Sequence, residues 1–147
     1  MTSHEFDVLK THSEHKRFES YKETRKWKGK TILIVEDVPS NFQLLEAYFS
    51  RTGMNIIHVE NGLEAIEVMK SPNAIDLIIM DIRLPKLNGI RSTQEIRKFR
   101  PDIPIIAQTA FAMDSDKELC IQSGCDAFLS KPFLKQELFD IIEYYIS

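Results

Sequence analysis

Short apolar runs alternate with longer segments of helical character along most of this 147-residue chain. Each run is too short for a buried helix and is bounded by residues such as Gly, Pro, Asn or Asp, which favours a strand. Strands that alternate with helices through short loops indicate a parallel sheet with right-handed crossovers. We therefore expect an α/β fold in which five helices alternate with five strands, at residues 31–35, 54–59, 74–80, 103–108 and 126–130.

Cap and turn residues delimit the expected helices. The first opens at Pro39 and ends before Gly53, and the second runs from Gly62 to the break at Ser71. The third lies between Gly89 and about residue 100, and the fourth spans residues 114–123. The last helix shows the cleanest helical period, with apolar residues predicted on one buried face at Leu134, Leu138, Ile141, Ile142 and Tyr145.

Residues 1–29 differ from the rest of the chain. The first 30 residues hold eight Lys or Arg against five Asp or Glu, a net charge of +3, which leaves −6 for residues 31–147 of the total −3. Thr2 and Glu5 fit a helix capping box, but the apolar residues that follow are too irregular for a coiled coil. We expect residues 1–29 to form a linker or charged helical extension and residues 30–147 to form the domain.

Composition narrows the functional classes. The chain is 43% hydrophobic and 28% charged, as in an ordinary globular protein, and no apolar run approaches the roughly 20 residues that span a bilayer. The acidic charge of residues 31–147 argues against direct nucleic-acid binding there. Two cysteines, Cys120 and Cys125, are too few for a disulfide scaffold, so we interpret them as apolar packing residues of a cytoplasmic protein.

Polar side chains follow four of the expected strands. They are Glu36 and Asp37 after the first strand, Asp81 after the third, Thr109 after the fourth and Lys131 after the fifth. A parallel sheet with helical crossovers gathers the carboxyl ends of its strands at one edge, where such folds bind ligands. We therefore expect three carboxylates, one hydroxyl and one lysine to meet in a small cleft.

This set of groups suits a divalent cation and a phosphoryl group. Mg²⁺ prefers oxygen ligands and is usually held by one or two carboxylates together with phosphate oxygens. Carboxylates this close repel one another unless a cation or Lys131 neutralises them. Phosphoryl transfer needs mainly positioning and charge neutralisation, and Thr109 can donate a hydrogen bond to a phosphoryl oxygen. The carboxylate of Asp81 is the nucleophile best placed to accept the group.

Four ordered motifs closely resemble the receiver domain of two-component response regulators. The resemblance covers roughly residues 30–147, and the motif sequences are most similar to those of receivers in hybrid histidine kinases. It implies a flavodoxin-like, doubly wound sheet of strand order 2-1-3-4-5. The motifs are Val35-Glu36-Asp37-x-x-x-Asn41, Ile79-Met80-Asp81-x-x-Leu84-Pro85-x-x-Asn88-Gly89, Gln108-Thr109-Ala110 and Ser130-Lys131-Pro132.

The resemblance also implies a role for each site residue. Asp81 would accept a phosphoryl group from a phosphohistidine on a sensor kinase or phosphotransfer domain, and the output would be a protein contact, not a released product. The metal, Mg²⁺ or Mn²⁺, would be held by Glu36, Asp37, Asp81 and the backbone carbonyl of Arg83. The remaining roles are a switch hydroxyl at Thr109, a switch aromatic at Phe128 and a cis peptide bond before Pro132.

Two other classes fit less well. Phosphatases with an aspartate nucleophile typically carry a second aspartate two residues later, where this chain has Arg83. Flavin-binding electron carriers of the same fold need a phosphate loop rich in glycine and hydroxyl groups after the first strand, and residues 38–41 are a poor match. Within the receiver class, a stand-alone regulator and a fragment of a hybrid kinase both remain open.

Overall fold

The computed structural model describes residues 26–84, 86–110 and 113–146. Five parallel strands form one sheet in the order β2-β1-β3-β4-β5, which confirms the predicted fold and strand order. The strands are β1 (Thr31–Val35), β2 (Asn55–Val59), β3 (Leu77–Asp81), β4 (Ile105–Thr109) and β5 (Ala127–Ser130).

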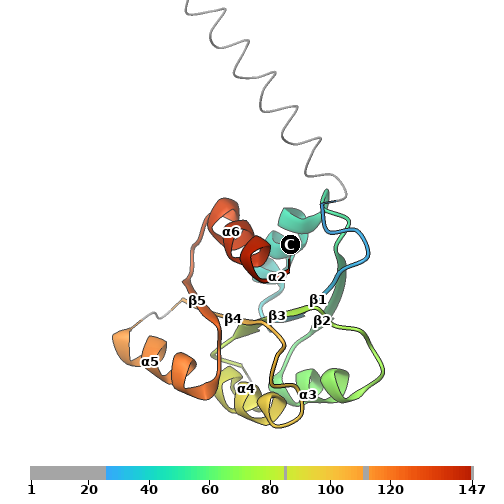
Figure 1. Ribbon diagram of the computed structural model, residues 1–147. Helices are drawn as coiled ribbons and strands as arrows, with labels where there is room; N and C mark the ends of the chain where they lie inside the picture. The colour runs from blue at the N-terminus through green and yellow to red at the C-terminus, as the bar shows by residue number, and fades with distance from the viewer. Residues whose placement is uncertain (1–25, 85, 111–112, 147) are drawn as a thin grey trace, which may run out of the picture.

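Within the described residues, five helices cover the two faces of this sheet. They are α2 (Pro39–Phe49), α3 (Gly62–Lys70), α4 (Gly89–Arg97), α5 (Asp114–Ser123) and α6 (Lys135–Ile146). In Figure 1, α2 and α6 lie on one face and α3, α4 and α5 lie on the other. None of the helices among the described residues is both long enough and apolar enough to span a membrane.

The central strands are buried on both faces, as parallel strands between two helical layers must be. Every residue of β3 and β4 is buried. Successive side chains of β1 alternate between the layers, so Ile32 and Ile34 pack in the cluster with α2 and α6 while Leu33 and Val35 pack in the opposite cluster. The sheet is therefore held between two apolar layers, and its carboxyl edge is fixed in position.

Trp27 belongs to the core, although the sequence placed it in the N-terminal extension. Its side chain is 3% exposed and its ring lies 4.8 Å from Phe139 and 6.2 Å from Phe49, centroid to centroid. Its backbone N–H donates to the carbonyl of Thr52 at 2.7 Å, and the neighbouring Lys26 pairs with Glu143 at 3.0 Å. The packed region thus begins before Lys30. Of the linker or helical extension expected at residues 1–29, residues 1–25 lie outside the described residues.

The prediction that Leu134 lies on the buried face of the last helix is wrong. Its side chain is 69% exposed and it precedes α6, whereas Leu138 and Ile142 are fully buried as predicted. The turn through Lys131–Pro132, whose peptide bond is cis, delays the helix until Lys135. The Leu134 backbone N–H instead donates to the Glu137 carboxylate at 3.2 Å, as a residue at a helix start does.

Candidate functional site

The predicted polar residues meet at the carboxyl edge of the sheet. Glu36 and Asp37 directly follow β1, Asp81 ends β3, Thr109 ends β4 and Lys131 directly follows β5. β3 lies between β1 and β4, so Asp81 stands at the centre of the group. The strand ends thus bring together the residues that the sequence analysis grouped.

Three carboxylates form the acidic part of the site. One ligand oxygen from each of Glu36, Asp37 and Asp81 lies within 4.8 Å of the others. Glu36 is fully buried and Asp81 is 5% exposed, whereas Asp37 is exposed. An all-oxygen set of this kind, closed on one side and open to solvent on the other, fits a hard cation that keeps several waters.

Lys131 supplies the positive charge among these carboxylates. Its Nζ atom lies 2.9 Å from Asp81 Oδ2 and 3.2 and 3.3 Å from the two carboxylate oxygens of Glu36. The side chain is only 15% exposed. Removing this cation would leave Glu36 and Asp81 close together and poorly solvated, so Lys131 compensates part of their repulsion.

Glu36 is held by neutral donors as well as by Lys131. Asn41 Nδ2 donates to its Oε1 at 2.7 Å, and Gln108 Nε2 donates to its Oε2 at 3.2 Å. Burial, and then the adjacent Asp81 carboxylate, raise the pKa of Glu36 from 4.5 to about 7. Glu36 therefore takes up a proton far more readily than an exposed glutamate, and a bound cation would compete with that proton.

The sequence did not indicate that His58 contacts Glu36 and Phe42. Its Nε2 atom lies 2.8 Å from the backbone carbonyl oxygen of Glu36, and its ring stacks on Phe42 at 3.7 Å with an angle of 4° between the planes. β2 pairs with β1 in register, with His58 opposite Ile34, which brings the ring to the end of β1. No local sequence pattern joins residues 42 and 58, so only the pairing of β1 with β2 could have indicated the contact.

The loop after β3 fixes the orientation of Asp81. The backbone N–H of Arg83 donates to Asp81 Oδ1 at 3.0 Å, which leaves Oδ2 for Lys131. Gly89 returns the chain to the end of β3 and donates its backbone N–H to the carbonyl of Ile82 at 2.8 Å. A β-carbon at Gly89 would overlap the backbone carbonyl of Asp81, so this close approach requires glycine.

Thr109 and Phe128 occupy neighbouring strands beside this group. Thr109 is 1% exposed, and its backbone carbonyl accepts from the N–H of Lys131 at 2.8 Å. Phe128 stands opposite Ala107 in the β4–β5 register and is partly buried against the small cluster of Ile82, Ala107 and Cys120. The two residues are therefore linked to the acidic site through the backbone of β4 and the start of the Lys131 turn.

Comparisons with known proteins agree with this arrangement. Residues 32–143 match the family described as the response regulator receiver domain. The polar-differentiation response regulator DivK of Brucella anthropi is 37% identical over 123 residues, covering 80% of this chain and 96% of that protein. The relatives thus match almost their whole length.

Solved structures give the same result. The receiver domain of the sensor histidine kinase PA1611 from Pseudomonas aeruginosa PAO1, solved with magnesium in its active site cleft, is 39% identical. It has a TM-score of 0.74 and covers 80% of this chain and 98% of that chain. A two-component response regulator from Clostridium difficile is 28% identical at a TM-score of 0.75, over 80% of this chain and 95% of that one. The chain belongs to the response regulator receiver family, the phosphoacceptor domains that histidine kinases phosphorylate in two-component systems.

Proposed function

We propose that Asp81 is the phosphoacceptor of this domain. The observation that carries the proposal is the contrast between the two oxygens of its carboxylate. Oδ1 accepts from the Arg83 backbone N–H at 3.0 Å, and Oδ2 lies 2.9 Å from Lys131 Nζ. The Asp81 carboxylate is thus held in one orientation at the centre of the site, next to the Lys131 ammonium group, which can neutralise the charge of the transferred phosphoryl group.

The transfer exchanges one bond to phosphorus for another. A carboxylate oxygen of Asp81 forms a bond to the phosphorus while the bond from phosphorus to the histidine nitrogen of the donor breaks. Lys131 lies where it can pair with the phosphoryl oxygens, as it pairs with Asp81 beforehand. The side chains that surround Asp81 therefore position the reactants and balance their charge, and the donor is a sensor histidine kinase or a phosphotransfer domain.

Mg²⁺, or Mn²⁺, is the cofactor that these residues would hold. The ligands in this proposal are carboxylate oxygens of Glu36, Asp37 and Asp81 and the backbone carbonyl of Arg83. Their mutual distances, within 4.8 Å for the three carboxylates, and their all-oxygen chemistry support it. When bound, the metal supplies positive charge that lets the carboxylates and the incoming phosphoryl group share the site.

Phosphorylation would be read out through Thr109 and Phe128. In this proposal the Thr109 hydroxyl donates to the phosphoryl group and Phe128 fills the space that the threonine leaves. Phe128 already packs against the cluster that contains Cys120 of α5, so its displacement would reach that helix. A coupling of about 1–3 kcal/mol changes the affinity for a partner roughly 5- to 150-fold.

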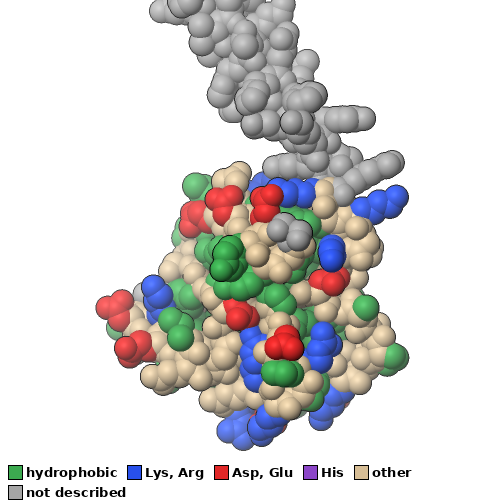
Figure 2. All heavy atoms as spheres, viewed as in Figure 1, with side chains coloured by type: hydrophobic (Ala, Val, Ile, Leu, Met, Phe, Trp, Pro, Cys, Tyr) green, Lys and Arg blue, Asp and Glu red, His purple; other side chains and the backbone are tan. Residues whose placement is uncertain are grey.

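The proposed output surface joins α5, β5 and α6. Apolar side chains reach the surface around α6 in Figure 2, where Tyr144 is 81% exposed. Met113 before α5 and Ile121 within it are 67% and 58% exposed. Exposed apolar side chains on these elements favour a protein contact.

We propose that residues 30–147 form the domain, in the cytoplasm, and that residues 1–29 form a linker or helical extension whose end at Trp27 packs into the core of the domain. Lys26 and Trp27 attach that segment to α6 and α2. Both a stand-alone regulator and a hybrid-kinase receiver fit this arrangement.

A small phosphodonor tests the proposed acceptor. Incubation of the full chain with acetyl phosphate and Mg²⁺ should add one phosphoryl group that is lost in base, as an acyl phosphate is. Asp81→Asn should remove the labelling, whereas Asp102→Asn, a matched change at an exposed aspartate after α4, should leave it intact. Labelling of Asp81→Asn at the rate of the unchanged protein would overturn the proposal.

A further inference from the structure

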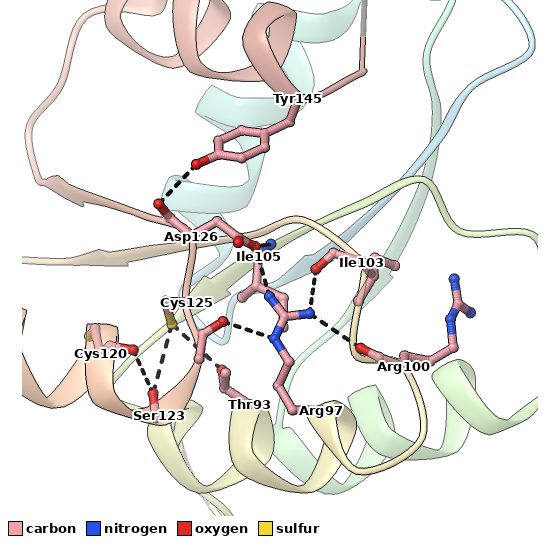
Figure 3. Close-up of polar contacts among 11 residues, drawn as sticks. Thr93, Arg97, Arg100, Ile103, Ile105, Cys120, Ser123, Cys125, Asp126 and Tyr145 are labelled. Carbon is pink, nitrogen blue, oxygen red and sulfur yellow. Dashed lines mark hydrogen bonds and ion pairs between the residues drawn. The ribbon is translucent and has the colours of Figure 1, made fainter.

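The two cysteines lie side by side at the turn between α5 and β5, away from the acidic site. Figure 3 shows Cys120 on α5 and Cys125 after the turn, with Ser123 between them. The Cys125 backbone N–H donates to the Cys120 carbonyl at 3.0 Å, and Gly124 takes the left-handed conformation with φ of 111°. This is the usual hydrogen bond of a glycine-terminated helix, which brings the two flanking side chains into contact.

The two thiols differ in access. Cys120 is completely buried, whereas Cys125 is partly exposed. Cys120 belongs to the apolar cluster that contains Ile82 and Ala107, and Cys125 packs against the same cluster. A disulfide needs α-carbons less than about 7 Å apart, and residues joined by one backbone hydrogen bond meet that need. Cys125 is thus the more accessible of the two residues, and the buried Cys120 lies next to it.

Polar groups surround Cys125 on its other sides. The Thr93 hydroxyl lies 3.8 Å and the Ser123 hydroxyl 4.0 Å from its sulfur. The Cys120 thiol first, and then Thr93, Ser123 and the charge of Arg97, lower the pKa of Cys125, although burial opposes them. The hydrogen bond to Cys125 and burial raise the pKa of Cys120. The Cys125 thiol is therefore the more readily ionised of the two, which is the property of a reactive cysteine.

Arg97 of α4 holds the turn rigid. Its Nε atom donates to the Gly124 carbonyl at 2.9 Å, and one guanidinium nitrogen pairs with Asp126 at 2.7 Å (Figure 3). The same Asp126 oxygen accepts from the Ile105 backbone N–H at 2.8 Å. The turn is thus fixed to α4 and β4 on both sides of Cys125, and the backbone of Cys125 is held next to Cys120.

We propose that Cys125 and Cys120 form a thiol oxidation site, in which Cys125 reacts with a hydroperoxide and Cys120 converts the product to a disulfide. The Cys125 thiolate attacks one peroxide oxygen, so an S–O bond forms, the O–O bond breaks and the leaving oxygen takes up a proton. Sulfur is oxidised to a sulfenic acid by two electrons and the peroxide is reduced to water or an alcohol.

The second step consumes the sulfenic acid. The Cys120 sulfur attacks the Cys125 sulfur, an S–S bond forms, the S–O bond breaks, and the oxygen leaves as water with the thiol proton. A thiol reductant reverses the result by disulfide exchange. Transient disulfides of this kind are the form that redox sensing takes in reducing compartments. The site is separate from Asp81 and needs no phosphorylation.

Peroxide treatment of the full chain tests this assignment. Reduced protein exposed to equimolar hydrogen peroxide should lose both free thiols, and the tryptic peptide that carries both cysteines should become lighter by two hydrogens and recover with dithiothreitol. Cys120→Ser, quenched into denaturant with dimedone, should give one adduct at Cys125. Retention of both thiols in the unchanged protein would overturn the proposal.

A matched variant and a measurement on the unchanged protein separate the two roles. In Cys125→Ser, the Cys120 thiol should be lost at least about tenfold more slowly than in the unchanged protein, because the accessible thiolate is gone. In the unchanged, reduced protein, brief iodoacetamide treatment should label Cys125 before Cys120. Equal labelling, or undiminished loss of Cys120 in Cys125→Ser, would show that Cys125 is not the reactive thiol.

Discussion

Replacing Glu36 by glutamine should stabilise the metal-free domain, and more so at higher pH. Glutamine keeps the shape of the protonated acid and can still accept from Asn41 and Lys131. Burial and Asp81 raise the pKa of Glu36 from 4.5 to about 7. A raised carboxyl pKa means that the folded state holds the proton more tightly, so its contribution to stability is present below pH 4.5 and is lost as pH rises through 7.

The size of the expected difference in stability follows from the difference between the two pKa values of Glu36, 4.5 and about 7. Each unit of pKa corresponds to about 1.4 kcal/mol, so full ionisation of Glu36 costs the folded state about 3 kcal/mol. Relative to Glu36→Gln, the unchanged protein should therefore be less stable by about 1 kcal/mol at pH 5 and by about 3 kcal/mol at pH 8. The difference between the two proteins removes the contributions of titrating groups that do not interact with Glu36.

Urea denaturation at several pH values in the presence of EDTA measures this difference. The free energy of unfolding of the two proteins should converge toward pH 4.5 and separate toward pH 8, with Glu36→Gln the more stable. Asp102→Asn, at an exposed aspartate, is the matched control and should give a small difference. A gap that does not change with pH, or a more stable unchanged protein at pH 8, would refute the reasoning.

Three further predictions concern the core, the cofactor and the lysine. Trp27→Ala should lower the free energy of unfolding, measured in urea, by about 3–5 kcal/mol, because a buried aromatic side chain is lost. Lys26→Ala should lower it by less than about 1 kcal/mol, because the ion pair of Lys26 is exposed. Equal effects of the two substitutions would show that Trp27 is not part of the core. Mg²⁺ affinity measured by calorimetry should fall by up to about tenfold per pH unit below pH 7, because Glu36 must lose its proton, and a flat profile from pH 6 to 8 would contradict this. Lys131→Ala should keep or raise Mg²⁺ affinity by removing a competing cation, and loss of binding would mean that Lys131 is structural.

The strand–helix pattern predicted the fold because each element carries its own local signal. Apolar runs and cap residues fix the five strands and helices, and polar residues at strand ends necessarily meet at one edge of a parallel sheet. Asp81 and Lys131 could therefore be paired from the sequence, although 50 residues separate them. The motif spacing then restricted the site to one family.

Other features depend on tertiary contacts that leave no local pattern. Trp27 stands alone in a charged segment, and only its packing against Phe49 and Phe139 reveals that it is core. The stacking of His58 on Phe42 depends on how β2 lies against α2. Cys120 and Cys125 pack in apolar clusters, as the sequence predicted, but the polar contacts around Cys125 come from α4 and α5 and leave no local sequence pattern. These contacts are determined by how distant segments pack together, and not by the local propensity of any one segment.

Borohydride trapping of the phosphorylated protein tests the central claim most directly. An acyl phosphate on an aspartate is reduced to homoserine, which peptide mass spectrometry locates to a single residue. After treatment with acetyl phosphate and Mg²⁺, we expect homoserine at position 81 alone. Homoserine at position 37, or a base-stable phosphate on Thr109 or another hydroxyl with position 81 unmodified, would contradict the assignment of Asp81 as the phosphoacceptor.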